Sequence, residues 1–285
     1  SNNLGVAISP DAIAEILGRL EFECSVNGDI VTAKTPPHRL DIHDGLIGRA
    51  DLLEEISRIY GYDKIPSRRL NQPLPPQRVD NEMAMEEVLR DLLVNLGLQE
   101  LIAYRMTAPE RESRRFPPDY DAPELAYVEI QNPITVDRRV MRRSTVASLL
   151  EIMEYNATLS DRLALFEIGP VFHPVEGQQL PDEKMMLSIG LTGKRTTPDW
   201  QNAAMEVMDF YDLKGVVEGM MAGLHIDEVR YVASQHPSLH PGKSADVLVN
   251  GKKVGAMGEL HPLAKANYEL GDAPVYLAEF DLIPL

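Results

Sequence analysis

The sequence is poor in cysteine, in aromatic residues and in positive charge. Its 285 residues include one cysteine, Cys24, and only 6% aromatic residues. A single cysteine excludes an internal disulfide framework and fits a reducing cytosol, so we expect a cytoplasmic protein. No apolar run approaches the ~20 residues of a membrane-spanning helix, and we expect no contact with a membrane. The start Ser1-Asn2-Asn3, without an initiator methionine, indicates an excised fragment with a short tag remnant.

The shortage of positive charge argues against autonomous RNA binding. There are 28 basic against 44 acidic residues, which gives a formal net charge of −16. A protein that holds RNA mainly through phosphate contacts is expected to be locally or globally basic. The densest basic runs are Arg138-Arg139 with Arg142-Arg143, and Arg68-Arg69, and neither is interleaved with aromatic residues.

The chain is long enough for one large domain or two ordinary ones. An apolar content of 44% and a charged content of 25% are typical of globular proteins. Residues 67–79 contain Pro73, Pro75 and Pro76 and few apolar residues, which is typical of an extended linker. We therefore predict a first domain over 1–70, a linker over 71–80 and a second domain over 81–285.

The first domain is predicted to contain a helix, a hairpin and a second helix. Ser9-Pro10-Asp11 is an N-cap signal for a helix that reaches about Leu20. Strands over Phe22–Val26 and Ile30–Lys34 flank a tight turn at 27–29. These elements also build winged-helix-like nucleic-acid-binding modules, so nucleic-acid binding is the natural alternative function. Eleven acids against eight bases in residues 1–69 argue against it.

The second helix of this domain carries an acidic face. Over Asp51–Tyr60 the apolar residues have the spacing of one buried helical face. Asp51, Glu54 and Glu55 lie at i, i+3 and i+4 on the opposite face, where like charges repel each other. Gly61 and Pro66 end the helix.

Two interpretations of this acidic face remain open. Three acids alone favour a solvated surface. Asp41 follows the rigid Pro36-Pro37 in an extended segment that leads back to the helix, and it adds a fourth carboxylate. Four convergent carboxylates suit a hard divalent cation, Mg²⁺ or Ca²⁺, and only His43 nearby would suggest a softer metal.

The second domain is predicted to be an α+β domain, an antiparallel sheet flanked by helices. Asn81 is expected to cap a long helix that Gly97 stops, and Ser144 to cap a helix that ends near Asn156. Asn250-Gly251 is the strongest hairpin signal in the chain. The other expected elements are strands over 100–106, 125–130, 162–168, 171–173, 185–192, 228–233, 245–249, 252–260 and 275–281, a bend at Gly169-Pro170, a turn at 240–242, a helix over 209–222 and a short helix after Pro262.

The acidic segment resembles a known family. Arg39-x-Asp41-Ile42, followed by Asp51-Leu-x-Glu-Glu-Ile-x-Arg-Ile-Tyr-Gly-Tyr-Asp-x-Ile-Pro66, is similar to the metal-binding domain of the beta subunit of bacterial phenylalanyl-tRNA synthetase. The resemblance implies that Asp41, Asp51, Glu54 and Glu55 bind Mg²⁺ at the contact with the alpha subunit. The gap between Asp41 and Asp51 is longer than is common in the family, which leaves Asp44 as an alternative first ligand.

Further motifs extend the resemblance over nearly the whole chain. They are similar to the catalytic-like module of the same beta subunit, which has the class II synthetase fold but is not itself catalytic. Pro170 departs from the pattern, because the family usually has Arg between Gly169 and Val171-Phe172. The matching motifs are Asn132-Pro-Ile134, Val140-Met-Arg-Arg-Ser144, Phe166-Glu-Ile-Gly169, Asp209-Phe-Tyr-Asp-Leu-Lys-Gly215, His240-Pro-Gly242 and Gly258-Glu-Leu-His-Pro262.

The residues themselves also argue against adenylate chemistry. Formation of an aminoacyl adenylate requires cations on the ATP phosphates. The segment Leu163–Gly169 carries no arginine, and no arginine follows Arg230. Lysine does not replace a bidentate arginine. We therefore predict no catalytic residues and no cofactor-binding residues apart from the metal ligands, and we interpret His236, His240 and His261 as ordinary loop histidines.

The resemblance implies a role in assembly. The chain would be a non-catalytic part of phenylalanine–tRNA ligase that packs against the catalytic alpha subunit in a heterotetramer of two alpha and two beta subunits. It would support the ATP-dependent attachment of phenylalanine to tRNA, and tRNA would be bound by the full complex. The alternatives are an active adenylate-forming enzyme and a winged-helix nucleic-acid-binding module.

Overall fold

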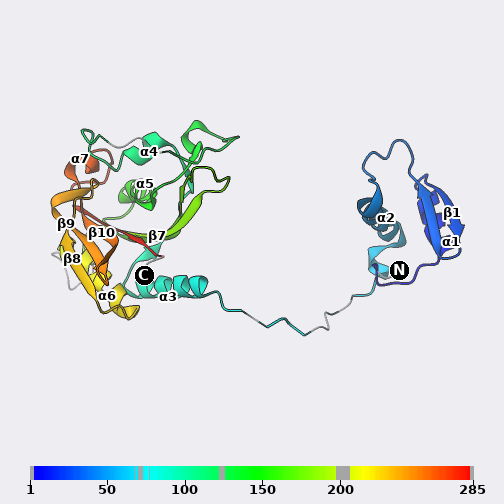
Figure 1. Cartoon of the computed structure of the whole chain (residues 1–285), viewed down its shortest axis with the longest axis horizontal. Helices are drawn as coiled ribbons and strands as arrows, with labels where there is room; N and C mark the ends of the chain where they lie inside the picture. Colours follow the sequence, from blue (N-terminus) through cyan, green and yellow to red (C-terminus); the bar gives the residue numbers. More distant parts are fainter. Residues whose placement is uncertain are drawn as a thin grey trace. The chain divides into compact units, whose positions relative to one another are not determined.

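The computed structural model describes residues 3–67, 69, 73–76, 78–121, 126–196 and 206–282. The chain divides into two compact units, residues 1–77 and 78–285, which are described separately below (Figure 1). Part of the predicted linker, residues 71, 72 and 77, lies outside the described residues, as do Ser1 and Asn2.

The first unit is built from two helices and a hairpin. The Ser9 hydroxyl accepts a hydrogen bond from the Ala12 N–H at 3.3 Å, so it caps the first helix as expected. The two strands pair antiparallel in the register Asn27↔Ile30, across Gly28 with its positive φ of 60°. The elements are α1 (Pro10–Gly18), β1 (Glu23–Asn27), β2 (Ile30–Lys34), α2 (Gly45–Tyr60) and the 3₁₀ turn η1 (Tyr62–Lys64).

The hydrophobic core of the first unit is small. Its buried members come from both helices and from the start of the hairpin, and they are Ile16, Leu17, Phe22 and Ile56. Ile56 lies on the predicted buried face of the second helix, and the acidic side chains lie elsewhere on that helix. The predicted burial pattern is therefore confirmed only in part, because Ser57 is also buried and the Glu55 side chain on the acidic face is only 12% exposed. The winged-helix character of the unit stays a prediction.

Helix α2 begins at Gly45, six residues before the predicted start at Asp51. Residues 45–50, which were expected to precede the helix, add more than one turn to it. Gly48 permits this, because a Cβ there would lie 1.7 Å from the His43 carbonyl oxygen. The segment before the helix thus packs directly against the backbone of its first turn, which sequence periodicity alone does not reveal.

The second unit is organised around a seven-stranded sheet with the order β3-β6-β7-β11-β10-β9-β8. The β3–β6 pair is parallel and the other pairs are antiparallel, so the sheet is mixed rather than wholly antiparallel. Its elements are α3 (Asn81–Asn95), β3 (Gln99–Glu100), β4 (Met106–Thr107), α4 (Pro109–Ser113), the 3₁₀ turn η2 (Val136–Arg138), β5 (Val140–Met141), α5 (Thr145–Ala157), β6 (Arg162–His173), β7 (Asp182–Gly193), α6 (Phe210–Gly223), β8 (Val229–Ala233), β9 (Leu239–Val249), β10 (Lys252–Leu260), α7 (Pro262–Lys265) and β11 (Val275–Asp281).

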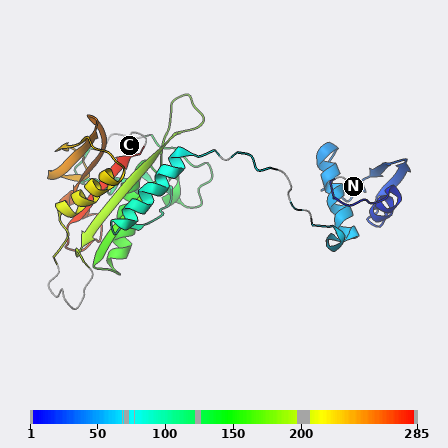
Figure 2. The ribbon, with the colours of Figure 1, turned by 90° about the horizontal axis from the view of Figure 1, so that it is seen from below.

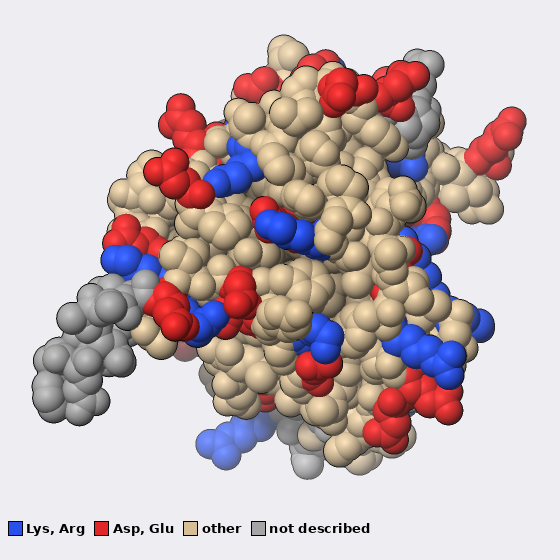
Figure 3. Space-filling view, turned by 90° about the vertical axis from the view of Figure 1, so that its left-hand side faces the viewer, with Lys and Arg blue, Asp and Glu red and all other residues tan. Residues whose placement is uncertain are grey.

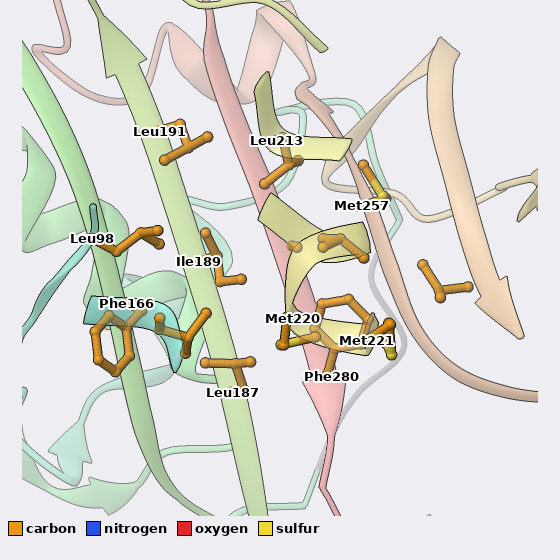
Figure 4. Close-up of a cluster of buried hydrophobic side chains, with 14 of the residues drawn as sticks. Leu98, Phe166, Leu187, Ile189, Leu191, Leu213, Met220, Met221, Met257 and Phe280 are labelled. Atoms are coloured by element: carbon orange, nitrogen blue, oxygen red, sulfur yellow. The ribbon is translucent and has the colours of Figure 1, made fainter. Parts of the chain in front are cut away.

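Helices cover both faces of this sheet. Helices α3 and α6 lie on one face and α5 lies on the other (Figure 2). On the α3–α6 face, Leu213, Met220 and Met221 of α6 point toward the strand residues Ile189 and Phe280 (Figure 4). Each face therefore has its own apolar layer, and the two layers are much larger than the core of the first unit.

Several predicted elements differ from the structure. The expected strand over 100–106 is two short strands, β3 and β4, with irregular chain between them. In the expected strand over 125–130, Leu125 lies outside the described residues, and the rest forms only an isolated bridge between Glu129 and Val140. Helix α3 is capped by Asp80 rather than Asn81, because the Asp80 carboxylate accepts from the N–H groups of Glu82 and Met83.

Two expected breaks turn out to lie inside strands. The predicted bend at Gly169-Pro170 is part of β6, which pairs with β7 without interruption. The predicted turn at 240–242 is part of β9, where the register with β10 shifts between Gly258 and Leu260. A local register shift absorbs the proline-containing segment without ending the strand.

Candidate carboxylate site

The acidic residues of the first unit lie on helix α2 and on the segment before it. Spacing of i, i+4 places Ile47, Asp51 and Glu55 on one stripe of α2. A neighbouring stripe contains Leu46, Ala50 and Glu54. Both stripes therefore begin with an apolar residue in the first turn and continue into carboxylates.

Arg39 binds two of the four predicted ligands. Its Nε and Nη2 donate to the two carboxylate oxygens of Asp41 at 2.9 and 2.7 Å, and Nη2 also donates to Glu55 Oε1 at 2.9 Å. The Arg39 guanidinium lowers the pKa of Asp41 to about 2. A hydrogen bond from Arg58, followed by the bonds from Arg39, lowers the pKa of Glu55. Both carboxylates are therefore held in their charged form by arginine.

The other two predicted ligands have different surroundings. Asp51 Oδ2 accepts from the His43 N–H at 3.0 Å and lies 3.3 Å from His43 Nδ1. Asp51 therefore fixes the segment before α2 to the helix. Glu54 is exposed. Asp44, the alternative first ligand, is the N-cap residue of α2, but its side chain makes no capping hydrogen bond.

The four carboxylates suit a hard cation in kind but are not assembled around one point. Carboxylate oxygens are the ligands that Mg²⁺ and Ca²⁺ prefer. Within the described residues, no three histidine, cysteine or acidic side chains are grouped so that they could hold a metal ion. Arg39 lies between two of the acids instead. This role of Arg39 was not predicted from the sequence, although the spacing Arg-x-Asp is a local signal for such a pair.

A second arginine–carboxylate pair lies in the second unit. Arg142 Nη1 donates to Glu167 Oε1 at 2.6 Å, and Arg142 Nε donates to the Pro170 carbonyl at 2.9 Å. The two side chains are only 1% and 2% exposed. Arg142 belongs to the basic run that also contains Arg138, Arg139 and Arg143, and its contact with Glu167 was not predicted. Glu167 in an otherwise apolar strand was the signal for it.

The remaining polar candidates have local structural roles. The Nδ1 atoms of His236, His240 and His261 accept hydrogen bonds from backbone N–H groups two residues further on. Ser144 Oγ accepts from the Val146 N–H at 3.1 Å and caps α5, as predicted. On the face shown in Figure 3, acidic and basic side chains are interspersed.

Two protein families match the chain. The family described as "tRNA synthetase B5 domain" matches residues 1–62. The family described as "Phenylalanyl tRNA synthetase beta chain CLM domain" matches residues 65–282. The second match begins at residue 65, before the division between the two compact units at residues 77 and 78.

Curated relatives of the chain are named as beta subunits of phenylalanine–tRNA ligase, the family that the sequence motifs resemble. A phenylalanine–tRNA ligase beta subunit from Clostridium acetobutylicum is 33% identical over 285 residues, which cover 99% of this chain and 34% of that protein. The beta subunit from Symbiobacterium thermophilum is 38% identical over 260 residues, which cover 90% of this chain and 28% of that protein. The chain spans about a third of the length of these relatives.

Solved structures share the fold of a large part of the chain. Two structures of pyrrolysyl-tRNA synthetase from Desulfitobacterium hafniense have TM-scores of 0.51 and 0.53 at 19% and 17% identity. Each comparison covers 70% of this chain, and 64% or 66% of the other chain. The predicted synthetase-like fold with a large sheet is thereby confirmed. In the part of the chain that the structure describes, no helix has the length and apolar character needed to cross a membrane.

Proposed function

The chain belongs to the phenylalanyl-tRNA synthetase beta-chain family, and from this premise we propose that it is a non-catalytic assembly portion of phenylalanine–tRNA ligase. Its partner is the catalytic alpha subunit, in a heterotetramer of two alpha and two beta subunits. ATP and tRNA are bound by the whole complex, in the cytoplasm. A metal-binding, winged-helix-like first domain and a catalytic-like second domain are parts of the same proposal.

Exposed apolar side chains beside the carboxylates carry this proposal. Leu40, Leu46 and Ile47 are 90%, 80% and 61% exposed. They lie on the segment before α2 and on its first turn, next to Asp41 and Asp51. Large apolar side chains that are exposed along one short segment of the chain favour an interaction site there. An apolar group bordered by acids suits a protein partner whose contact surface is apolar and edged by basic residues.

Helix α3 of the second unit supports the same role. Met83, Val88 and Val94 on this helix are 65%, 48% and 52% exposed, although Leu89 and Leu93 on its other side are buried. A helix that is apolar on both sides is usually covered by a further element. We infer that a partner subunit covers the outer side of α3.

We further propose that Asp41, Asp51, Glu54 and Glu55 hold Mg²⁺, with Asp44 as the alternative to Asp41. The cation would neutralise a set of acids that otherwise repel one another. The kind of donor supports this proposal, since all the candidate side chains are carboxylates. Asp41 and Glu55 have to be released from Arg39 before their oxygens become available.

Co-purification tests the proposed partner. The full beta subunit and the alpha subunit are co-expressed, with the tag on alpha. We expect Leu46→Asp combined with Ile47→Asp to reduce recovery of beta by about tenfold, which corresponds to ~1.4 kcal/mol. Leu180→Asp is the matched control, because Leu180 is 76% exposed but lies in the second unit. Equal recovery of both variants, or normal phenylalanine transfer to tRNA by alpha alone, would contradict the proposal.

A further inference from the structure

Arg39 connects two segments that are far apart in the sequence. It lies in the segment before α2, and it reaches Glu55 in the middle of that helix, sixteen residues further on. The same guanidinium holds Asp41 by two parallel hydrogen bonds. Its Cζ also lies 5.9 Å from the ring centroid of Phe22, which is 4% exposed in the core of this unit. One side chain thus ties the segment, the helix and the core together.

The arginine contacts use the oxygens that a metal would need. Both carboxylate oxygens of Asp41 accept from Arg39. Glu55 Oε1 accepts from Arg39, and Glu55 Oε2 accepts from Arg58. A divalent cation at these oxygens would stand within a few ångströms of a guanidinium, where like charges repel strongly. The guanidinium and the cation therefore compete for the same place.

The two arginines differ in how firmly they are held. The Arg39 side chain is 20% exposed, bridges two acids and packs near an aromatic ring. The Arg58 side chain is 49% exposed, and among the described residues its ion pair is with Glu55, one turn away on the same helix. Exposed pairs at this spacing contribute little to stability. Arg39 is therefore the residue whose displacement decides whether the carboxylates can converge.

We propose that Arg39 is a built-in counter-cation of this carboxylate set, and that Arg39 and a divalent cation exclude each other. This inference rests on the proposed metal site. Without the metal, Arg39 keeps Asp41 and Glu55 together and holds the segment before α2 in place. With the metal, Arg39 leaves both acids. Arg39 is thus a positioning residue that weakens the metal affinity and makes the fold of the unit independent of the metal.

Calorimetric titration with MgCl₂ of the 285-residue chain tests this exchange. We expect Arg39→Gln to bind Mg²⁺ about tenfold more tightly than the wild type, which corresponds to ~1.4 kcal/mol. Without Mg²⁺ the same variant is expected to melt at a lower temperature, and Mg²⁺ is expected to restore the melting temperature. Arg39→Lys, which keeps the charge but loses the bidentate geometry, should lie between the two. Arg49→Gln, at an exposed position of the same helix, is the matched control and should bind Mg²⁺ like the wild type.

The possible results separate the inference from the proposed function. If the wild type binds Mg²⁺ and Arg39→Gln binds it equally or more weakly, the exchange is wrong and the metal site stands. If neither protein binds Mg²⁺, the proposed metal site is wrong, and the inference with it. Loss of binding in Glu54→Gln would assign the measured affinity to this site.

A measurement on the wild type covers the case in which Arg39→Gln does not fold. The NMR signal of the Arg39 Nε–H group reports its hydrogen bond to Asp41. We expect this signal to shift during the Mg²⁺ titration with the same midpoint as the calorimetric binding curve. A stationary signal during saturable Mg²⁺ binding would overturn the exchange.

Discussion

The two units each contain an arginine bound to carboxylate, but the two contacts lie at very different depths. Arg142 and Glu167 are 1% and 2% exposed, whereas Arg39 and Asp41 are 20% and 61% exposed. A buried pair cannot be opened without leaving an uncompensated charge, so it fixes one arrangement. A pair near the surface can be opened at low cost, because water and other ions replace the partner. Similar chemistry therefore fixes one arrangement in the second unit, whereas the contact in the first unit can be opened more easily.

The hydrophobic cores differ in the same sense. The second unit has two extended apolar layers, one on each face of its sheet. In the described part of the first unit, the hydrophobic core cluster has four buried members. Small domains bury a smaller fraction of their surface and are less stable. The first unit is thus expected to depend more on polar contacts such as those of Arg39.

The largest effect is expected from breaking the buried pair. Arg142→Met leaves the Glu167 charge buried without its partner. We expect this change to lower the free energy of unfolding by about 3–5 kcal/mol. Arg142→Met combined with Glu167→Met should restore much of the loss. Arg39→Met should cost clearly less. Urea unfolding measures all three, and a loss below about 1 kcal/mol in Arg142→Met would contradict the role of depth.

Core truncation compares the two units directly. Leu93→Ala in α3 and Ile56→Ala in α2 each remove a buried side chain, at 0% and 6% exposure. Each should cost about 2–5 kcal/mol. We expect Ile56→Ala to unfold the first unit and Leu93→Ala to leave the second unit folded, because the larger core has more stability to lose. Amide hydrogen exchange, measured separately for the two units, reports which of them has unfolded. Persistent protection of the first unit in Ile56→Ala would contradict this prediction.

Helix caps provide a smaller test. Ser9→Ala removes one hydrogen bond, to the Ala12 N–H, and should cost ~1 kcal/mol. Ser144 is 2% exposed and also donates to Glu279 Oε1 at 2.9 Å. Ser144→Ala should therefore cost more than Ser9→Ala in unfolding free energy. Equal losses in thermal unfolding would show that the depth of the contact is unimportant at these positions.

The smallest effect is the pH dependence of the exposed pair. In the folded chain the pKa of Asp41 is lowered to about 2 by Arg39, whereas an unfolded aspartate titrates near ~3.9. A lowered pKa stabilises the folded state above the unfolded value, and this contribution is lost as the pH falls from about 4 toward about 2. The stability difference between wild type and Asp41→Asn should shrink over this range. High salt should reduce it throughout, and a difference independent of pH would rule out the ion pair as its source.

Local signals predicted much of the fold. Asn250 and Gly251 have positive φ angles of 50° and 78°, as the hairpin signal at these residues requires. The Ser9 and Ser144 caps were also predicted correctly. The strand order was not predictable, because it depends on contacts between distant segments such as β3 and β6. The early start of α2 depends on the close approach of His43 to Gly48, which is likewise a tertiary contact.

The sequence predicted the candidate site by residue type rather than by arrangement. Asp51, Glu54 and Glu55 share the helix expected for them, and whether they bind Mg²⁺ stays a prediction. The role of Arg39 was missed because its contact with Glu55 spans sixteen residues. Arg142 was missed because a charged residue in a basic run is usually on the surface. In both cases the three-dimensional partner, not the residue type, determines the role.

The proline in β6 has a consequence for aggregation. The Phe166 carbonyl accepts from the Leu101 N–H, and the Phe172 N–H donates to the Arg142 carbonyl. The backbone N–H and C=O groups of even-numbered residues in this strand therefore point away from β7. Pro170 has the same parity, and its carbonyl is occupied by Arg142 Nε. On the outer edge of β6 beyond Phe166, Pro170 therefore offers no N–H donor, and its carbonyl already accepts a hydrogen bond from Arg142. An unpaired strand from another molecule finds no regular ladder to join there. Pro170 and Arg142 together protect the outer edge of this long strand against the edge-to-edge pairing that begins fibril growth.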